Sequence, residues 1–216
     1  MRASDWDLPG LLARRLALPL RRLGSQPLFA PELSYGRHAM PPLPDTRPAA
    51  VLILLYPHRD EWMLPLTVRP PTLSAHAGQI SLPGGSAHAD ETCERAALRE
   101  CEEELGVPAG YLTVLGRLTP LFVYNSNYYV TPCVASMANR PEFRPNPAEV
   151  ADLLELPVRE LANPDRWGEH WIHRRAVRFR APHLFWNGRR IWGATRMILA
   201  EFAAVVSELS PSSQTT

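Results

Sequence analysis

The chain has 216 residues, of which 45% are hydrophobic, and its formal net charge is +1. This length and apolar content suit one substantial core rather than two full domains. A balanced charge gives no general attraction to polyanions, so we expect no nucleic-acid partner.

The cysteines and the apolar runs indicate the compartment. Cys93, Cys101 and Cys133 form an odd set without metal-type spacing, and the first two lie eight apart on one expected helix, too far to form a disulfide. No apolar run approaches the length of a membrane span, and the N-terminal segment lacks the apolar region of a signal peptide. We therefore expect a soluble, cytoplasmic protein with no membrane partner.

The N-terminal segment differs in composition from the rest of the chain. Residues 4–23 alternate leucines with arginine pairs at helical spacing, which predicts one or two short amphipathic helices interrupted at Pro9 and Pro19. Docking on the chain's own domain or on a partner subunit is favoured over contact with a membrane surface. The following residues, 24–48, are rich in proline and predict an extended connector.

The folded domain begins with two strands. Residues 49–56 predict a buried strand, and residues 61–69 predict a second strand after a turn at 57–60. Pro65 lies within the second strand, which indicates an edge position or a bulge.

A glycine-punctuated loop at residues 70–85 precedes a helix. Asp90 is its expected N-cap, Glu91 lies in its expected first turn, and Gly106 followed by Pro108 ends it.

The remaining elements are mixed. Strands are expected at 112–123, 128–137 and 149–156, a hairpin turn at Asn187 and Gly188, and a final helix at 195–208. This order favours an α+β or three-layer αβα arrangement. The expected organisation is a helical and proline-rich extension (1–45), a folded domain (46–209) and a flexible tail (210–216).

The helix after the glycine loop crowds acids at its closing end. Glu100, Glu103 and Glu104 share one face, while Glu102 points elsewhere. Like charges at this spacing repel, and acids near a helix C-terminus face the negative end of the dipole. A solvated acidic face is one explanation. A bound Mg²⁺ or Mn²⁺ is the other, because these cations prefer carboxylate oxygens, whereas zinc would require histidine or cysteine ligands.

The flanking residues support a ligand site. Arg99 lies close enough on the helix to orient or partly neutralise one of the acids. Gly84 and Gly85 form a turn in which backbone groups can approach a ligand without side chains in the way. Ala97, Cys101 and Leu105 form a separate stripe that we expect to pack on the sheet.

These residues match a known family. Gly85, five residues, Glu91, seven residues and then the run from Arg99 to Val107 resemble the Nudix box in every fixed position, with Cys101 where a bulky aliphatic residue is usual. The resemblance implies an αβα sandwich with a mixed sheet and metal-dependent hydrolysis of a diphosphate linked to another moiety.

The resemblance also implies roles for single residues. Glu100, Glu103 and Glu104 would be the metal-binding acids, and the carbonyl of Gly85 is a candidate further ligand. Glu91 and Arg99 would support the loop and the helix.

Residues 64–85 resemble the motif of the coenzyme A pyrophosphatase branch. The matching residues are Leu66, Thr67, Arg69, Gly78, Pro83, Gly84 and Gly85, and the departures are Pro65, Pro70, Ser74 and Leu82. Ser74 replaces an arginine that could contact a phosphate of coenzyme A. His76 and Gln79 fit variants of the branch, as do Trp192, Gly193 and Thr195. The expected substrate is therefore a small nucleotide derivative, coenzyme A or an acyl-coenzyme A.

Several roles stay open at this point. The general base is Glu100 or Glu149, where Glu149 is equally an ordinary acid at a strand start. Arg69 is the chosen phosphate contact, with a surface salt bridge as the alternative. His76 contacts substrate or only braces its loop.

The basic residues near the C-terminus are also ambiguous. They would meet the phosphates of coenzyme A, or lie on a solvated strand face or a homodimer surface; they are Arg174, Arg175, Arg178 and Arg180. The alternative functions are a pyrophosphatase for ADP-ribose, dinucleotides or damaged nucleotides, and a catalytically silent nucleotide-binding module.

The candidate substrate-binding set is Arg69, His76, Gly78, Gln79, Gly84 and Gly85. The candidate catalytic set is Arg99, Glu100, Glu103, Glu104 and Glu149.

Overall fold

The computed structural model describes residues 3, 6–20, 32, 43–72, 78–174 and 177–209. Its main sheet contains the strands β1 (Arg47–His58), β2 (Glu61–Val68), β3 (Ile80–Ser81), β4 (Gly84–Ser86), β5 (Thr113–Arg117), β6 (Leu121–Val123), β7 (Tyr128–Ser136) and β8 (Asp152–Pro157). The α-helices are α1 (Leu8–Leu16), α2 (Cys93–Leu105) and α3 (Gly193–Leu209). Short 3₁₀ helices lie at η5 (Ala109–Tyr111), η6 (Tyr124–Ser126), η7 (Val158–Ala162) and η8 (Pro164–Arg166).

Strand β1 is the centre of the main sheet. It runs parallel to β7 over most of its length and antiparallel to β2 at its end. Its first half also pairs with the short strand β4, so that Ala50 lies opposite Gly85 and Val51 opposite Gly84. Strands β5 and β6 pair with β7, and β3 and β8 pair with β2, which makes the sheet mixed.

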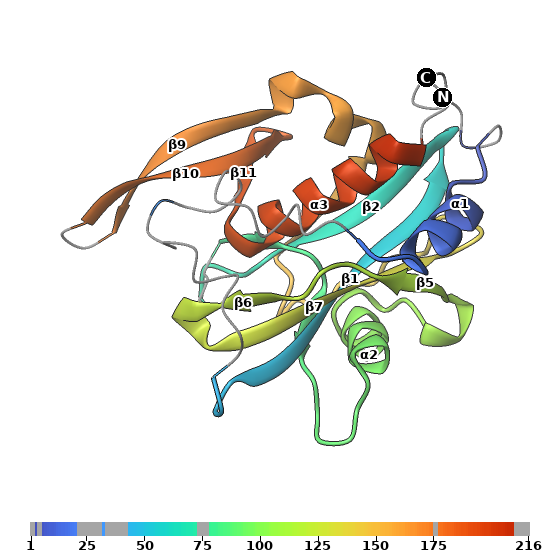
Figure 1. Ribbon diagram of the computed structural model, residues 1–216, viewed down its shortest axis with the longest axis horizontal. Coiled ribbons are helices and arrows are strands. Elements are labelled where there is room, and N and C mark those ends of the chain that lie inside the picture. The colour runs from blue at the N-terminus through green and yellow to red at the C-terminus, as the bar shows by residue number, and fades with distance from the viewer. Residues whose placement is uncertain are drawn as a thin grey trace.

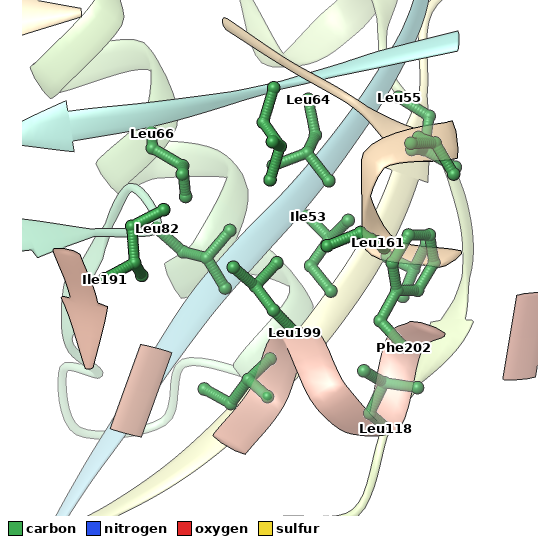
Figure 2. Close-up of a cluster of buried hydrophobic side chains, with 14 of the residues drawn as sticks. Ile53, Leu55, Leu64, Leu66, Leu82, Leu118, Leu161, Ile191, Leu199 and Phe202 are labelled. Atoms are coloured by element: carbon green, nitrogen blue, oxygen red, sulfur yellow. The ribbon is translucent and has the colours of Figure 1, made fainter. Parts of the chain in front are cut away.

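The two faces of this sheet carry different helices (Figure 1). Alternate residues of β1 point to opposite faces, so Leu52 and Leu54 join the core under α2. Ile53 and Leu55 join the core shared with α1 and α3, where Figure 2 shows them near Phe202. The expected αβα sandwich with a mixed sheet is therefore confirmed.

The protein also contains a second, three-stranded sheet. It consists of β9 (Trp167–Arg174), β10 (Val177–Trp186) and β11 (Arg189–Trp192), and β11 contacts β3. Asn187 and Gly188 both have positive φ, at 47° and 74°, as a two-residue type I′ turn requires. The expected hairpin is thus confirmed, and its second strand, β11, contacts β3 within the segment expected as the glycine loop.

The basic residues of β10 have local partners. Arg178 stacks over the Trp171 ring at 4.0 Å, and Arg180 pairs with Glu169 and Glu32. These contacts fit a polar strand face. Arg175 lies outside the described residues.

Several sequence-based boundaries were wrong. Helix α2 is capped by Thr92 rather than Asp90, because Asp90 has a left-handed φ of 64° in the preceding turn, and Glu91 therefore lies before the helix. Strand β8 begins at Asp152, so Glu149 lies in the turn before it. The strand expected at 112–123 is divided into β5 and β6.

Pro9 and Pro65 were both expected to affect the element that contains them, and only the expectation for Pro9 was wrong. Pro9 lies in the first turn of α1 and does not interrupt it, because a first-turn N–H needs no helical partner. Pro65 lies between the β2 residues that pair with β1 and those that pair with β3.

The chain docks α1 on its own domain. Leu8 and Leu12 are fully buried against the α3 side of the core. The Asp7 side chain accepts the Gly10 N–H at 3.0 Å, and Arg15 pairs with Glu208 of α3 at 2.6 Å. The N-terminal helix is therefore part of the folded core. The boundary at residue 45 stays a prediction.

The burial of α1 gives a stability prediction. Leu12→Ala should lower the free energy of unfolding by about 2–4 kcal/mol, because it removes a fully buried side chain and leaves a cavity. Leu18→Ala is the matched control, since Leu18 is 61% exposed, and it should change stability by less than about 0.5 kcal/mol. Denaturant unfolding of both variants checks this, and equal losses would contradict the docking of α1.

All three cysteines are free thiols, with Cys101 and Cys133 buried. Within the described ranges, no helix combines the length and apolar character needed to cross a membrane.

Candidate functional site

Helix α2 positions the acidic side chains. The Thr92 hydroxyl accepts the Arg95 N–H at its start, and Gly106 ends it with a left-handed φ of 67°. Ala97, Cys101 and Leu105 are buried against the sheet, as their spacing predicted. Glu102 points away from the other acids and accepts the Ala109 N–H at 3.0 Å.

Arg99 connects the helix to the loop before it. Its guanidinium binds Glu91 in a bidentate pair, with both N···O distances at 2.9 Å, and its Nη2 also donates to the Ser86 carbonyl at 3.0 Å. Its Nη1 binds Glu100 at 2.8 Å and Glu103 at 3.1 Å. The guanidinium of Arg99 therefore fixes the loop, through Glu91 and Ser86, and also the positions of the Glu100 and Glu103 carboxylates.

This arrangement changes the pKa of Glu91. The hydrogen bonds from Arg99, followed by the His88 backbone N–H, lower the pKa of Glu91 to about 2. The same pairing with Glu91 raises the pKa of Arg99. Glu91 is therefore a permanent anion that holds the loop.

The two glycines of the loop lie where a side chain would not fit. A Cβ on Gly84 would lie 2.4 Å from the Ala50 carbonyl oxygen, and its φ is 156°. A Cβ on Gly85 would lie 2.5 Å from the carboxylate of Glu100. The loop backbone thus approaches both β1 and an acid of the helix.

Glu104 is the buried acid of the site, with an exposed fraction of 4%. Burial raises its pKa to about 8, and the backbone hydrogen bond from Gly84 opposes this shift. Its Oε2 atom is buried and has no hydrogen-bond partner among the described residues. Such an atom is costly unless something positive binds it.

Glu149 and Arg69 belong to other parts of the fold, and their charges act on Glu104. The charges of Glu100 and Glu149 both raise the pKa of Glu104, whereas the charge of Arg69 lowers it. Arg69 follows β2, and its Nε is buried without a hydrogen-bond partner in the described part of the chain. A surface salt bridge, the alternative explanation for Arg69, is not seen there.

The other predicted residues have mixed placements. Gly78 and Gln79 close the loop by backbone hydrogen bonds with Arg69, at 3.1 and 2.9 Å. Glu103 has a side chain that is 53% exposed and turned to Arg99. His76 and Ser74 lie outside the described residues.

One residue that the sequence analysis missed is Asn146. Its N–H donates to the Glu104 carbonyl at 2.9 Å, and its side-chain amide lies 3.5 Å from the Glu149 carboxylate. The sequence shows it only as part of an Asn-Pro turn, and the long-range contact has no local signal.

The donor chemistry of the site fits a hard divalent cation. Glu100 and Glu104 supply carboxylate oxygens, and the unpartnered Oε2 of Glu104 is an open ligand position. The described residues contain no preassembled group of three His, Cys, Asp or Glu side chains in metal-binding geometry. Two of the acids are instead held by Arg99, so a cation would have to compete for them.

The contact between Gly85 and Glu100 gives a second prediction. Gly85→Ala should lower turnover by about tenfold to a hundredfold, because the new Cβ would displace the Glu100 carboxylate. Gly110→Ala is the control, since a Cβ there meets nothing within 4 Å, and it should keep wild-type turnover. Steady-state kinetics on both variants checks this, and equal rates would contradict it.

The glycine turn leads directly into an acidic helix that packs on one face of the sheet, which is the arrangement that the resemblance to the Nudix box implied. The chain belongs to the NUDIX domain family, whose model matches residues 46–178. It is thus a Nudix hydrolase, an enzyme class that hydrolyses pyrophosphate linkages in nucleoside diphosphate derivatives and generally uses divalent metal ions.

The chain is also similar to a curated relative and to two solved structures. An uncharacterized Nudix hydrolase, NudL, of Yersinia pestis is 40% identical over 162 residues, which are 74% of this chain and 80% of that protein. A Nudix hydrolase from M. smegmatis, RenU, is 28% identical over 55% of this chain and 74% of its own, with a TM-score of 0.47. A MutT/nudix family protein from Enterococcus faecalis is 15% identical over 84% of this chain and 70% of its own, with a TM-score of 0.49.

Proposed function

We propose that the protein hydrolyses coenzyme A or an acyl-coenzyme A to 3′-phospho-AMP (adenosine 3′,5′-bisphosphate) and the corresponding 4′-phosphopantetheine. Water adds to one phosphorus and the bridging P–O bond breaks, which gives two phosphomonoesters. The observation that carries this proposal is the place of Arg69. It directly follows β2, within the segment 64–85 that resembles the coenzyme A motif, and its charge acts on Glu104.

We assign the substrate contacts as follows. Arg69 would bind a phosphate oxygen of the substrate, because guanidinium groups match phosphate geometry. The backbone at Gly84 and Gly85 would lie against the pyrophosphate, where a side chain would block the approach. Gly78 and Gln79 support this arrangement because they hold the backbone of Arg69.

Glu100, Glu103 and Glu104 would hold Mg²⁺ or Mn²⁺, with the Gly85 carbonyl as a further ligand. When bound, the cation would neutralise negative charge on the pyrophosphate and lower the pKa of the attacking water. Arg99 would keep the carboxylate of Glu100 turned toward the loop.

We propose Glu149 as the general base. Arg99 binds the alternative base, Glu100, at 2.8 Å, so one oxygen of that carboxylate is already engaged in a hydrogen bond. The described side-chain hydrogen bond of Glu149 is a long one, of 3.5 Å, to Asn146. Among the ion pairs of the described residues, its carboxylate has no cationic partner, unlike that of Glu100.

A substrate panel tests the proposal. Coenzyme A, acyl-coenzyme A, NADH, ADP-ribose and nucleoside triphosphates are each assayed with Mg²⁺ and with Mn²⁺. We expect the highest kcat/KM for coenzyme A or its acyl forms, with 3′-phospho-AMP (adenosine 3′,5′-bisphosphate) among the products. A preference for ADP-ribose, a dinucleotide or a damaged nucleotide would overturn the substrate, and saturable binding without metal-dependent product would indicate a silent module. A cytoplasmic location and a homodimer stay predictions from the sequence.

A further inference from the structure

The segment that joins β7 to β8 carries Glu149, and backbone hydrogen bonds anchor the segment on both sides of this residue. The Arg144 N–H donates to the Leu105 carbonyl at 2.8 Å, at the last turn of α2. At the other end, the Ala151 N–H donates to the Val68 carbonyl at 2.8 Å, next to Arg69. Glu149 is thereby placed between the acidic helix and the end of β2.

Side chains fix the first part of this segment. Phe143 packs edge-on against the buried Tyr56 ring, with centroids 5.5 Å apart. Arg140 binds Glu155 of β8 through two hydrogen bonds of 2.8 and 2.9 Å. Gly106 permits the close approach to α2, because a Cβ there would lie 2.8 Å from the Cβ of Arg144. The start of the segment is therefore held independently of Glu149.

Asn146 makes the remaining connection. Its carbonyl accepts the Glu149 and Val150 N–H groups at 3.0 and 2.8 Å, and its Oδ1 accepts the Ala148 N–H at 3.1 Å. Its own N–H donates to the Glu104 carbonyl at 2.9 Å, and its Nδ2 lies 3.5 Å from Glu149 Oε1. One residue thus contacts the backbone of Glu104 and both the backbone and the carboxylate of Glu149.

We propose that Asn146 is a positioning residue that sets the Glu149 carboxylate relative to the acidic helix α2. The inference rests on the proposed role of Glu149. A glutamate side chain has three rotatable bonds, and the amide of Asn146 restricts it while the Asn146 N–H keeps the turn in register with Glu104. Misplacing a catalytic group by about 1 Å can cost about a hundredfold in rate.

The test is a double-mutant cycle with a matched control. Asn146→Ala should lower kcat by about tenfold and change KM by less than about twofold. In the Glu149→Gln background the same change should have no further effect, because Asn146 acts through that carboxylate. Asn146→Ser keeps an oxygen that can accept the Ala148 N–H but lacks the amide donor. It should keep the wild-type unfolding midpoint and lose as much kcat as Asn146→Ala.

Two results would overturn the proposal: losses that multiply in the double variant, or wild-type kcat for Asn146→Ser. Wild-type kcat for Glu149→Gln would remove the role of both residues together. The assay uses whichever panel substrate the wild type hydrolyses fastest, so a substrate other than coenzyme A changes the proposed function and leaves this test intact.

Discussion

Glu104→Gln will lower turnover by at least about 10³-fold and leave the fold intact. Glu104 is the buried acid of the site, and its Oε2 has no hydrogen-bond partner among the described residues. A carboxamide has nearly the same shape but no negative charge, so the variant loses the interaction with a divalent cation and keeps the packing. Steady-state kinetics with Mg²⁺ and Mn²⁺ measures the loss.

The same variant should be more stable than the wild type without metal. The pKa of Glu104 rises from 4.5 to about 8 on folding, so the buried carboxylate destabilises the protein progressively as the pH rises through this range. A shift of this size sets an upper limit of about 5 kcal/mol, which water penetration reduces. Unfolding in chelator at pH 4 should show no difference between the proteins, and at pH 8 the variant should be the more stable.

Glu102→Gln is the matched control for both measurements. It is the same substitution on the same helix, but Glu102 faces away and accepts the Ala109 N–H, which a glutamine oxygen can also accept. It should keep wild-type turnover and the wild-type response to Mg²⁺ in a thermal unfolding assay. If Glu104→Gln retained turnover, or if Mg²⁺ stabilised it as much as the wild type, the metal assignment would be wrong.

Arg99→Met will lower turnover by about a hundredfold. The guanidinium holds Glu91, Glu100 and the Ser86 carbonyl at once, so its loss frees the loop and one acid of the site together. Arg99→Lys should rescue only part of the rate, because an ammonium group cannot form the bidentate pair and also reach the other partners. Arg95→Met is the control, since Arg95 is exposed on the same helix, and it should keep wild-type turnover.

The stability of Arg99→Met should depend on pH in a defined direction. The pKa of Glu91 is lowered to about 2, so its pairing with Arg99 contributes stability above about pH 4.5 and loses it as the pH falls toward 2. The variant should therefore be less stable than the wild type at pH 7, and the difference should close at pH 2. A difference that is constant over this range would mean that the pairing contributes nothing to stability.

The parts of the fold that follow from local periodicity were predictable. The uninterrupted apolar run in residues 49–56 predicted β1 as a buried strand, in agreement with the burial of both of its faces, and the apolar stripe at Ala97, Cys101 and Leu105 predicted the packed face of α2. The arrangement of the loop and the helix was implied by the resemblance to the Nudix box, which Gly85, Glu91 and Glu100 carry. These features depend on neighbouring residues, so the sequence contains them.

Features that depend on distant contacts were not predictable. Glu149 was expected at a strand start because apolar residues follow it, whereas hydrogen bonds from Arg144 and Asn146 to the end of α2 hold it in a turn. Only the contact of Arg99 with Glu103, four residues on, could be expected from helix geometry. Its contact with Glu91 requires the loop to fold back. Thr92 and Asp90 are both good capping residues, and only the backbone shows which one caps.

Helices α1 and α3 complete the core that lies behind the site, in which Figure 2 shows Leu199 and Phe202 of α3. The region matched by the family model, residues 46–178, includes neither α1 nor α3. A gene fragment trimmed to that match would leave Ile53 and Leu55 facing solvent, along with the rest of that face of the sheet. Such a fragment should aggregate on expression, so homology limits are a poor guide to where this protein can be cut.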